Sequence, residues 1–179
     1  MPIMCEIKLQ IFMLFQDDPT KCTASKLVKF KLAQRVNFIS EKSVLLNPLS
    51  KVSLSRKDSA LSSSICAVDC SWNNTHGILN SRKTLGHRLA RRIPSLLASN
   101  PTNYSKIGKL STAEALAGAL YILGDRRTPK LIMNKFKWGH TFLELNCNIL
   151  EDYFNAENEL QIAEIEKEYF PLTLKLKYQ

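Results

Sequence analysis

Two short apolar runs constrain the fold of this chain more than any other feature. The segments SVLLNP, from residue 43, and SICAVDC, from residue 64, are nearly continuous in apolar residues and end in residues typical of loops. Such runs are typical of strands buried on both faces of a parallel sheet. A further strand is expected over residues 5–15, and DDPTKCTASKLVKFKLA after it predicts a loop and then a helix. Strands that alternate with helices predict an α/β fold.

The second half of the chain has helical patterns instead. Ser111 and Glu114 have the spacing of a capping box, and Gly124 is suited to end the apolar helix that this box would begin. The segment before this helix reads as a fourth buried strand, IPSLL, followed by the polar loop ASNPTNYSKIGKLST. Buried loop backbone needs polar partners, and a bound ligand is one candidate for them.

Further helices are expected beyond residue 124. The signals are Thr128-Pro129 as a start with Gly139 as a stop, the segment HTFLELNCNILEDYF, and an Asn155 cap before an acidic helix that ends near Tyr169. These patterns predict a helical second half after about residue 110. We expect an N-terminal α/β domain over residues 1–92 and a mainly helical C-terminal domain over residues 93–179.

The charge is unevenly distributed along the chain. The net charge is +9, but residues 151–179 hold seven acidic residues against three lysines, so the other 150 residues carry 22 basic and 9 acidic residues. A strongly cationic body favours a polyanionic partner, with nucleic acid as the leading candidate. The alternative is a solvated basic surface that serves solubility alone.

Several classes of protein are disfavoured by the sequence. The apolar run near residue 10 is about half as long as a membrane span requires, and the flanking residues do not resemble a secretory leader. Five scattered cysteines favour reduced thiols, and we expect a cytoplasmic protein without a membrane segment. Walker and dinucleotide-binding glycine motifs are absent, as are the common hydrolase motifs.

A metal site is not expected either. Cys66 and Cys70 have a suggestive spacing, but no second pair complements them, because His76, His87 and His140 lie far apart in the sequence.

The candidate site residues follow from the predicted sheet. In an open α/β sheet, ligands bind beyond the carboxyl ends of the strands, which here are followed by DDPTKCT, LLNP, VDCSW and the polar loop. Asp69 stands at the end of a strand, where its carboxylate can orient a hydroxyl or accept a proton. Trp72 offers a flat apolar wall. A role for Asp69 in capping the next turn is an equal alternative.

Basic residues gather immediately before the fourth expected strand. Arginine side chains suit phosphate, so this cluster is the candidate RNA-backbone site, with an exposed basic helix face as the alternative. The cluster comprises Arg82, Lys83, Arg88, Arg91 and Arg92, extended by Lys106, Lys109, Arg126 and Arg127.

Five segments in this order resemble the small-subunit rRNA aminocarboxypropyltransferase family of archaea and eukaryotes. They are DDPTKCTASKLVKF, VLLNPLSKVSLSRKD, VDCSWNNT, RRIPSLLASNPTNYSKIGKLSTAEALAGALYILG and KFKWGHTFLELN, which cover about residues 16–154. The resemblance implies a SPOUT-like parallel sheet with a deep trefoil knot and an all-helical C-terminal domain. It also implies transfer of the 3-amino-3-carboxypropyl (acp) group from S-adenosylmethionine, bound at the knot, to N3 of a (N1-methyl)pseudouridine in small-subunit rRNA.

The same resemblance implies roles for individual residues. Asp69 would act at the reacting centre, as a base or only to orient the target. The cofactor contacts would be Leu46 and Pro48 around the adenine, Trp72 against the methyl group, Thr23 and the backbone near Val68 at the nucleoside, and the backbone at Ile93 and Gly108 with the Thr112 hydroxyl at the amino-acid end.

The partner implied is small-subunit rRNA or a pre-ribosomal particle, bound by a monomer without a metal. The alternatives are a SPOUT-type rRNA methyltransferase and a non-catalytic assembly factor that binds pre-rRNA.

Overall fold

The structure is a computed structural model that describes residues 7–14, 21–69 and 86–171. Expected site residues Trp72, Arg82 and Lys83, and Cys70 of the disfavoured metal pair, lie outside the described residues. The strands in the described part of the chain are β1 (Lys8–Met13), β2 (Gln34–Val36), β3 (Val44–Leu46), β4 (Ser64–Asp69) and β5 (Ala90–Arg91).

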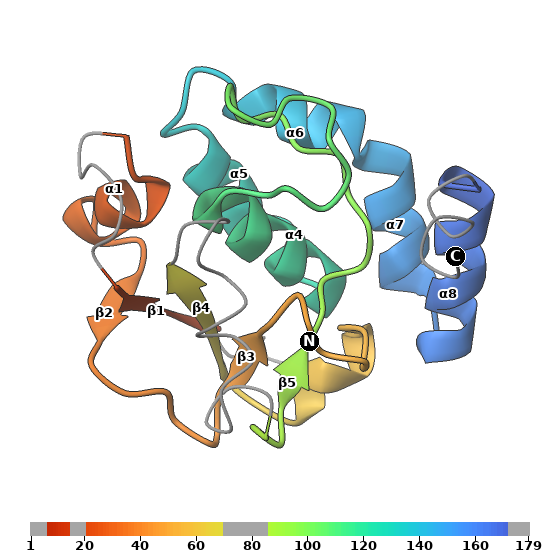
Figure 1. The fold of residues 1–179 in the computed structure, drawn as a ribbon, viewed down its shortest axis with the longest axis horizontal. Helices are drawn as coiled ribbons and strands as arrows, with labels where there is room; N and C mark the ends of the chain where they lie inside the picture. The colour runs from red at the N-terminus through yellow and green to blue at the C-terminus, as the bar shows by residue number, and fades with distance from the viewer. Residues whose placement is uncertain (1–6, 15–20, 70–85, 172–179) are drawn as a thin grey trace.

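These strands form one parallel sheet in the order β2-β1-β4-β3-β5 (Figure 1). The central ladder pairs β1 with β4 along its whole length, from Lys8 opposite Ser64 to Met13 opposite Asp69. Because every pair is parallel, the carboxyl ends of the strands lie along one edge, which we name the carboxyl edge. The α/β class and the parallel sheet are thus confirmed, and β1, β3 and β4 lie within the segments predicted to form strands.

Helices form most of the regular structure in the second half of the described chain. Helix α4 lies at the centre, α5, α6 and α7 lie beside it, and α8 is outermost (Figure 1). None of the helices among the described residues combines the length and the apolar character that crossing a bilayer requires. The helices are α1 (Thr23–Lys29), the 3-10 helix η1 (Arg56–Ala60), α4 (Thr112–Leu123), α5 (Thr128–Met133), α6 (Gly139–Leu145), α7 (Cys147–Asn155) and α8 (Glu159–Tyr169).

Helix α4 begins and ends as its sequence predicts. The Ser111 hydroxyl accepts from the Glu114 amide at 3.3 Å, the Glu114 carboxylate accepts from the Ser111 amide at 2.7 Å, and Gly124 ends the helix with φ of 105°. Helix α4 packs against β4, α1, α5, α7 and η1, which explains why nearly all of its faces are apolar.

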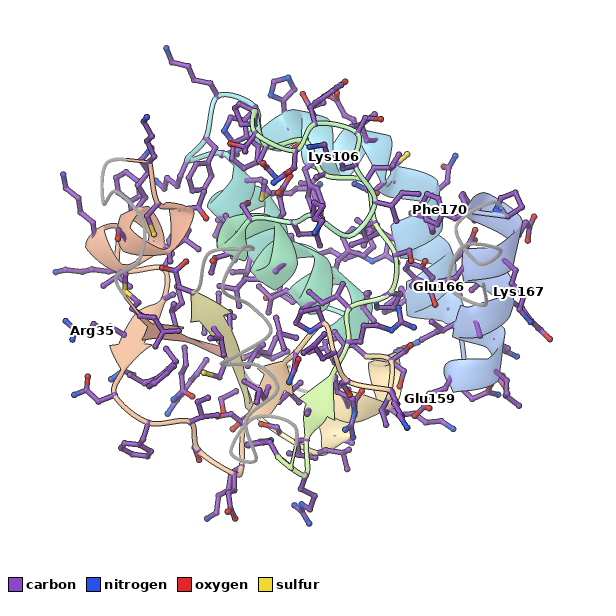
Figure 2. The ribbon with its side chains drawn as sticks, in the orientation of Figure 1. Arg35, Lys106, Glu159, Glu166, Lys167 and Phe170 are labelled. Carbon is purple, nitrogen blue, oxygen red and sulfur yellow. The ribbon has the colours of Figure 1, made fainter. Side chains whose placement is uncertain are left out.

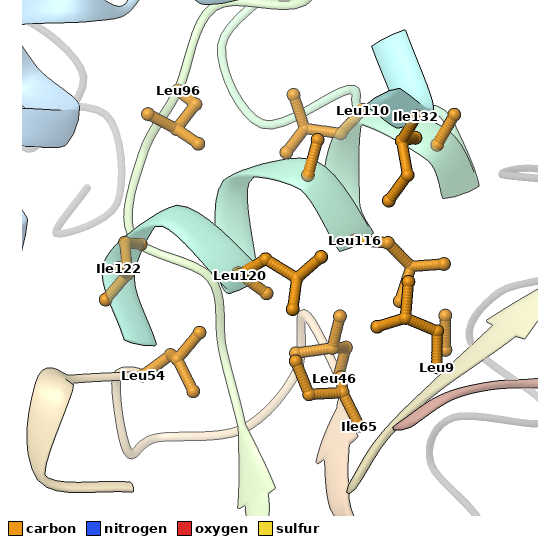
Figure 3. Packing of buried hydrophobic residues seen from close by; sticks show 14 of the residues in the cluster. Leu9, Leu46, Leu54, Ile65, Leu96, Leu110, Leu116, Leu120, Ile122 and Ile132 are labelled. Atoms are coloured by element: carbon orange, nitrogen blue, oxygen red, sulfur yellow. The ribbon is translucent and has the colours of Figure 1, made fainter. Parts of the chain in front are cut away.

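One hydrophobic core joins the two halves of the chain. Leu116 and Leu120 of α4 lie over Leu46 and Ile65 of the sheet (Figure 3). The same buried cluster continues to Ile162 in α8. It spans the boundary expected between residues 92 and 93, so the division into two domains stays a prediction, as does the trefoil knot.

The fourth strand expected at IPSLL is wrong in its position. The paired strand is the two-residue β5, just upstream. The expected segment contains Pro94, which has no backbone N–H to donate, and this makes it a poor strand. From residue 93 onward the backbone runs away from the sheet toward the helices, with one antiparallel bridge between Leu97 and Ile107.

Three expected helix boundaries also differ. Gly139 begins α6 rather than ending α5, and a glycine is needed there because a side-chain carbon would overlap the Met133 carbonyl. Asn155 is the last residue of α7, and Asn158 caps α8 instead, accepting from the amides of residues 160 and 161. Helix α5 starts at Thr128, so Arg127 holds the cap position that the pattern gave to Thr128.

Candidate functional site

Three segments that are far apart in the sequence meet at the end of β4. Asp69 accepts a hydrogen bond from the Thr112 hydroxyl at 3.0 Å on one carboxylate oxygen and from the Cys22 thiol at 3.3 Å on the other. Asp69 is the last residue of β4, Cys22 caps α1, and Thr112 is the first residue of α4. Asp69 is 8% exposed, and its two hydrogen bonds fix the orientation of the carboxylate at the carboxyl edge.

The chemistry of Cys22 suits its role as a donor. Burial raises the pKa of the Cys22 thiol, and the nearby Asp69 charge adds to this, although the hydrogen bond from Ser25 acts in the opposite direction. The thiol is therefore protonated at neutral pH and can donate to Asp69 while its sulfur accepts from the Ser25 amide at 3.3 Å.

Thr23 connects the same two helices. Its hydroxyl oxygen accepts a hydrogen bond from the Ala113 amide at 3.3 Å. The first turn of α4 thus has its amides at Ala113 and Glu114 engaged by side chains of Thr23 and Ser111. Thr23, Asp69 and Thr112 therefore lie together, and their contacts with a cofactor stay a prediction.

Buried side chains from the helices satisfy the backbone of the segment that leads into the polar loop. The Ser95 amide donates to Glu166 at 2.7 Å, the Leu97 amide to Asn146 at 2.8 Å, and the Ser99 amide to Glu114 at 2.6 Å. These three side chains come from α8, from the junction of α6 with α7, and from α4. The polar partners that this backbone needs are thus supplied by the protein itself.

Glu114 carries the largest share of this bonding. It has no exposed surface, and one carboxylate oxygen accepts from the amides of Ser99 and Asn100 at 2.6 and 2.9 Å. Its other oxygen accepts from the Asn100 side chain at 2.8 Å and from the Ser111 amide at 2.7 Å. Glu114 thus joins both ends of the polar loop to the start of α4, next to Thr112.

The remaining expected cofactor contacts lie along the carboxyl edge or in the polar loop. Leu46 is buried at the end of β3, Pro48 is exposed two residues later, and Val68 is half-buried in β4. Ile93 is half-buried just after β5. Gly108 has φ of 71°, a left-handed conformation that favours glycine, and its amide donates to the Leu96 carbonyl at 2.9 Å.

Arg91 and Arg92, both expected to bind RNA, are engaged in largely buried ion pairs. Arg91 donates to Asp58 at 2.8 Å, and its side chain is 12% exposed. Arg92 donates to both oxygens of Glu166 at 2.7 and 3.0 Å and to the hydroxyl of Ser53 at 2.6 Å. Their RNA contacts stay a prediction, and the geometry favours a structural role for both.

The Arg92–Glu166 pair shifts the pKa values of both partners. Burial alone would raise the pKa of Glu166, but the hydrogen bonds and charge of Arg92, with the bonds from Ser95, hold that pKa below its ordinary value. The same pair raises the pKa of Arg92. Glu166 lies on the side of α8 that faces α7 (Figure 2).

The other expected RNA contacts are solvent-exposed. Arg88, Lys106 and Lys109 are exposed, and Lys106 lies on the polar loop, at the top of the view in Figure 2. Arg126 pairs with Glu151 at 2.7 Å. Its neighbour Arg127 is exposed as well.

The sequence reasoning missed the parts played by Cys22 and Asn146. Cys22 stands beside Thr23 in the KCT segment, but nothing in the pattern marks its thiol as a partner of Asp69. Asn146 looks like a loop residue, although it is fully buried and bonds both the amide and the carbonyl of Leu97. Within the described residues, no three His, Cys, Asp or Glu side chains form a group that could hold a metal ion.

A family model and several curated proteins match most of this chain. The family model described as "Ribosome biogenesis protein, C-terminal" matches residues 44–170. The 16S rRNA aminocarboxypropyltransferase of Thermoplasma volcanium is 44% identical over 161 residues, which are 88% of this chain and 94% of that protein. The protein of that name from Sulfurisphaera tokodaii is 44% identical over 164 residues, 90% of this chain and 95% of the relative.

A solved structure is also similar. It is that of the SAM-dependent rRNA:acp-transferase Tsr3 from Vulcanisaeta distributa, with a TM-score of 0.81 and 35% identity. The match covers 92% of this chain and 89% of that one.

Proposed function

Because this chain belongs to the ribosome biogenesis protein family that includes the 16S rRNA aminocarboxypropyltransferases, we propose that it transfers the acp group from S-adenosylmethionine to small-subunit rRNA. The observation that carries this proposal is similarity over nearly the whole length of these relatives, together with a carboxylate held at the carboxyl edge. Ligands of open α/β sheets bind at that edge.

The residues at the carboxyl edge fit a zwitterionic nucleoside. We assign Leu46 and Pro48 to the adenine, and Thr23 with the backbone near Val68 to the nucleoside. Thr112, at the start of α4, has a hydroxyl that donates to Asp69 and whose oxygen can still accept from the ammonium group at the amino-acid end. We assign the cofactor contacts to these residues, to the backbone at Ile93 and Gly108, and to Trp72 as the wall against the methyl group.

S-adenosylmethionine supplies a carbon activated by its sulfonium. In the transfer, the bond from sulfur to the acp carbon breaks, a bond from uracil N3 to that carbon forms, and methylthioadenosine leaves. The N3 proton must also leave. The role of this chain is to present the acp carbon rather than the methyl carbon to the uracil, which is a matter of orientation.

We assign Asp69 to the N3 proton. Its two oxygens already accept from Thr112 and Cys22, so the carboxylate is held in one orientation toward the edge where the target would bind. A carboxylate in that place orients the N3–H and can accept its proton. Glu114 fixes the polar loop and the start of α4, which keeps Thr112 in place for Asp69.

We take the finer features of the proposal from the family that the sequence resembles. They are a pseudouridine target, with or without N1 methylation, a pre-ribosomal particle as the physiological substrate, a trefoil knot at the cofactor site, and a cytoplasmic monomer. We propose RNA contacts at Arg88, Lys106 and Lys109, with Arg82 and Lys83, and assign Arg91 and Arg92 to holding the segment after β5.

The proposal is tested by label transfer to small-subunit rRNA. S-adenosylmethionine labelled in its carboxyl carbon should transfer label to the rRNA, whereas cofactor labelled in its methyl carbon should not, and methylthioadenosine should accumulate. Transfer of the methyl label would support a methyltransferase instead. Binding of rRNA without transfer of either label would support a non-catalytic assembly factor.

A further inference from the structure

Two segments beside the proposed site carry lysines and arginines but no carboxylate. Residues 21–36 contain four lysines and one arginine, residues 126–140 contain three lysines and two arginines, and neither segment contains Asp or Glu. Lys26, Lys29 and Phe30 come from the first segment, and Lys135 and Lys137 from the second. We name these five residues the lysine face.

Cation–ring contacts join the two segments. The Lys135 ammonium lies 5.2 Å from the centre of the Phe30 ring, and the Lys26 ammonium lies 6.0 Å from the centre of the Phe136 ring. The end of α1 therefore lies against the turn between α5 and α6, and Figure 1 shows α1 on the same side of the molecule as α5. The two contacts bring the basic segments together at this place.

The charge of the lysine face is not compensated within the described residues. The ion pairs found there involve Arg91, Arg92 and Arg126, and none includes a lysine of the face. Lys29, Lys135 and Lys137 are exposed, and Phe30 keeps 45% of its surface exposed. A group of like charges around an exposed aromatic ring repels itself and favours a partner that is both anionic and able to stack.

The lysine face adjoins the proposed site. Helix α1 starts at Thr23, which contacts Ala113, directly after Cys22, which contacts Asp69. Since α1 has seven residues, its length is about 10 Å. On the other side, the Ser99 hydroxyl donates to the Trp138 carbonyl at 3.5 Å, so the polar loop contacts the chain just beyond Lys137.

We propose that the lysine face binds the rRNA strand that flanks the modified base, with its lysines on the phosphates and Phe30 stacked on an unpaired base. Cationic side chains around an exposed aromatic ring are the usual platform for single-stranded nucleic acid. An acidic protein would match the charge but would leave the Phe30 ring unused. The inference rests on the proposed function and adds RNA contacts in α1 and in the turn after α5 to those expected from the sequence.

The charge part of the proposal is tested with matched lysine variants. The variant Lys29→Gln/Lys135→Gln/Lys137→Gln removes three charges from the face, and the control Lys8→Gln/Lys42→Gln/Lys167→Gln removes three exposed charges elsewhere. Affinity for a small-subunit rRNA transcript is measured over a range of salt concentrations. The face variant should bind about tenfold or more weakly, and its salt dependence should fall by about two ions, since each phosphate contact on a single strand contributes about 0.7.

The stacking part is tested with matched phenylalanine variants. Phe30→Ala should weaken rRNA binding about tenfold without a change in the salt dependence, and Phe30→Tyr should restore it. Phe38→Ala is the control, since Phe38 is 76% exposed in the link between β2 and β3. Circular dichroism and urea unfolding would show that each variant keeps its fold.

The outcomes separate this inference from the proposed function. If the face variant and the control variant lose the same affinity and the same salt dependence, the proposal that the lysine face binds rRNA is wrong. This holds even if the wild-type enzyme transfers the acp group. A wild-type protein that binds rRNA through the face but transfers no acp group would overturn the proposed function alone. A wild-type protein that does not bind the transcript would overturn the lysine face.

Discussion

Replacing Glu114 with alanine should lower the stability of the fold, because this side chain bonds the polar loop to the start of α4. The carboxylate accepts four close hydrogen bonds from Ser99, Asn100 and Ser111, at 2.6 to 2.9 Å, in a site with no exposed surface. Its removal leaves three backbone amides without an acceptor, and each buried unsatisfied donor costs about 1–3 kcal/mol. Water entering the space left by the side chain recovers part of that, so we expect a loss of about 3–5 kcal/mol in the free energy of unfolding.

Urea denaturation followed by circular dichroism measures this loss. Glu144→Ala is the matched control, because Glu144 is an exposed glutamate in α6 and its loss should change stability by less than about 0.5 kcal/mol. Glu114→Gln keeps the side-chain volume but presents an amide N–H to a backbone donor. Its loss of stability should therefore lie between those of Glu144→Ala and Glu114→Ala. If Glu114→Ala lowers the free energy of unfolding by less than about 1 kcal/mol, Glu114 does not hold the polar loop as we infer.

Three other predictions concern the cofactor site and the ion pair of α8. Asp69→Asn should lower turnover at least about a hundredfold with little change in affinity for S-adenosylmethionine, and full activity would reduce Asp69 to a structural cap. Trp72→Ala should weaken calorimetric binding of S-adenosylmethionine about tenfold or more, and unchanged affinity would remove the methyl wall. The lowered pKa of Glu166 means that its pair with Arg92 stabilises the fold fully above the ordinary glutamate pKa of 4.5 and loses this contribution as the pH falls through the lower folded-state value. Glu166→Gln should therefore be about 3 kcal/mol less stable than wild type at pH 7, and in urea unfolding this gap should narrow as the pH falls below 4.5; a gap that is independent of pH would argue against the pair.

The sequence predicts the parts of the fold that local pattern controls. The apolar runs of β3 and β4 mark buried strands, and the capping box of Ser111 with Glu114 marks the start of α4. The order of the strands does not follow from local pattern, because β3 lies between β4 and β5 only through long-range packing. The two-residue β5 is too short to leave a pattern of its own.

The candidate site is predictable to a similar degree. Asp69 and Thr112 stand at the end of a strand and the start of a helix, and the rule for open α/β sheets places both at the carboxyl edge. The ion pair between Arg92 and Glu166 cannot be predicted from the sequence, because the two residues are 74 positions apart. A basic residue in a cluster looks the same in sequence whether it faces a phosphate or a buried carboxylate, and only the packing of α8 decides between them.

Nucleoside analysis of small-subunit rRNA from cells that lack this gene is the most direct test of the central claim. The account predicts that an acp-modified uridine derivative present in wild-type rRNA is absent from the mutant, returns with the wild-type gene, and does not return with Asp69→Asn. An unchanged level of the acp-modified nucleoside in the mutant, or full restoration by Asp69→Asn, would contradict the account.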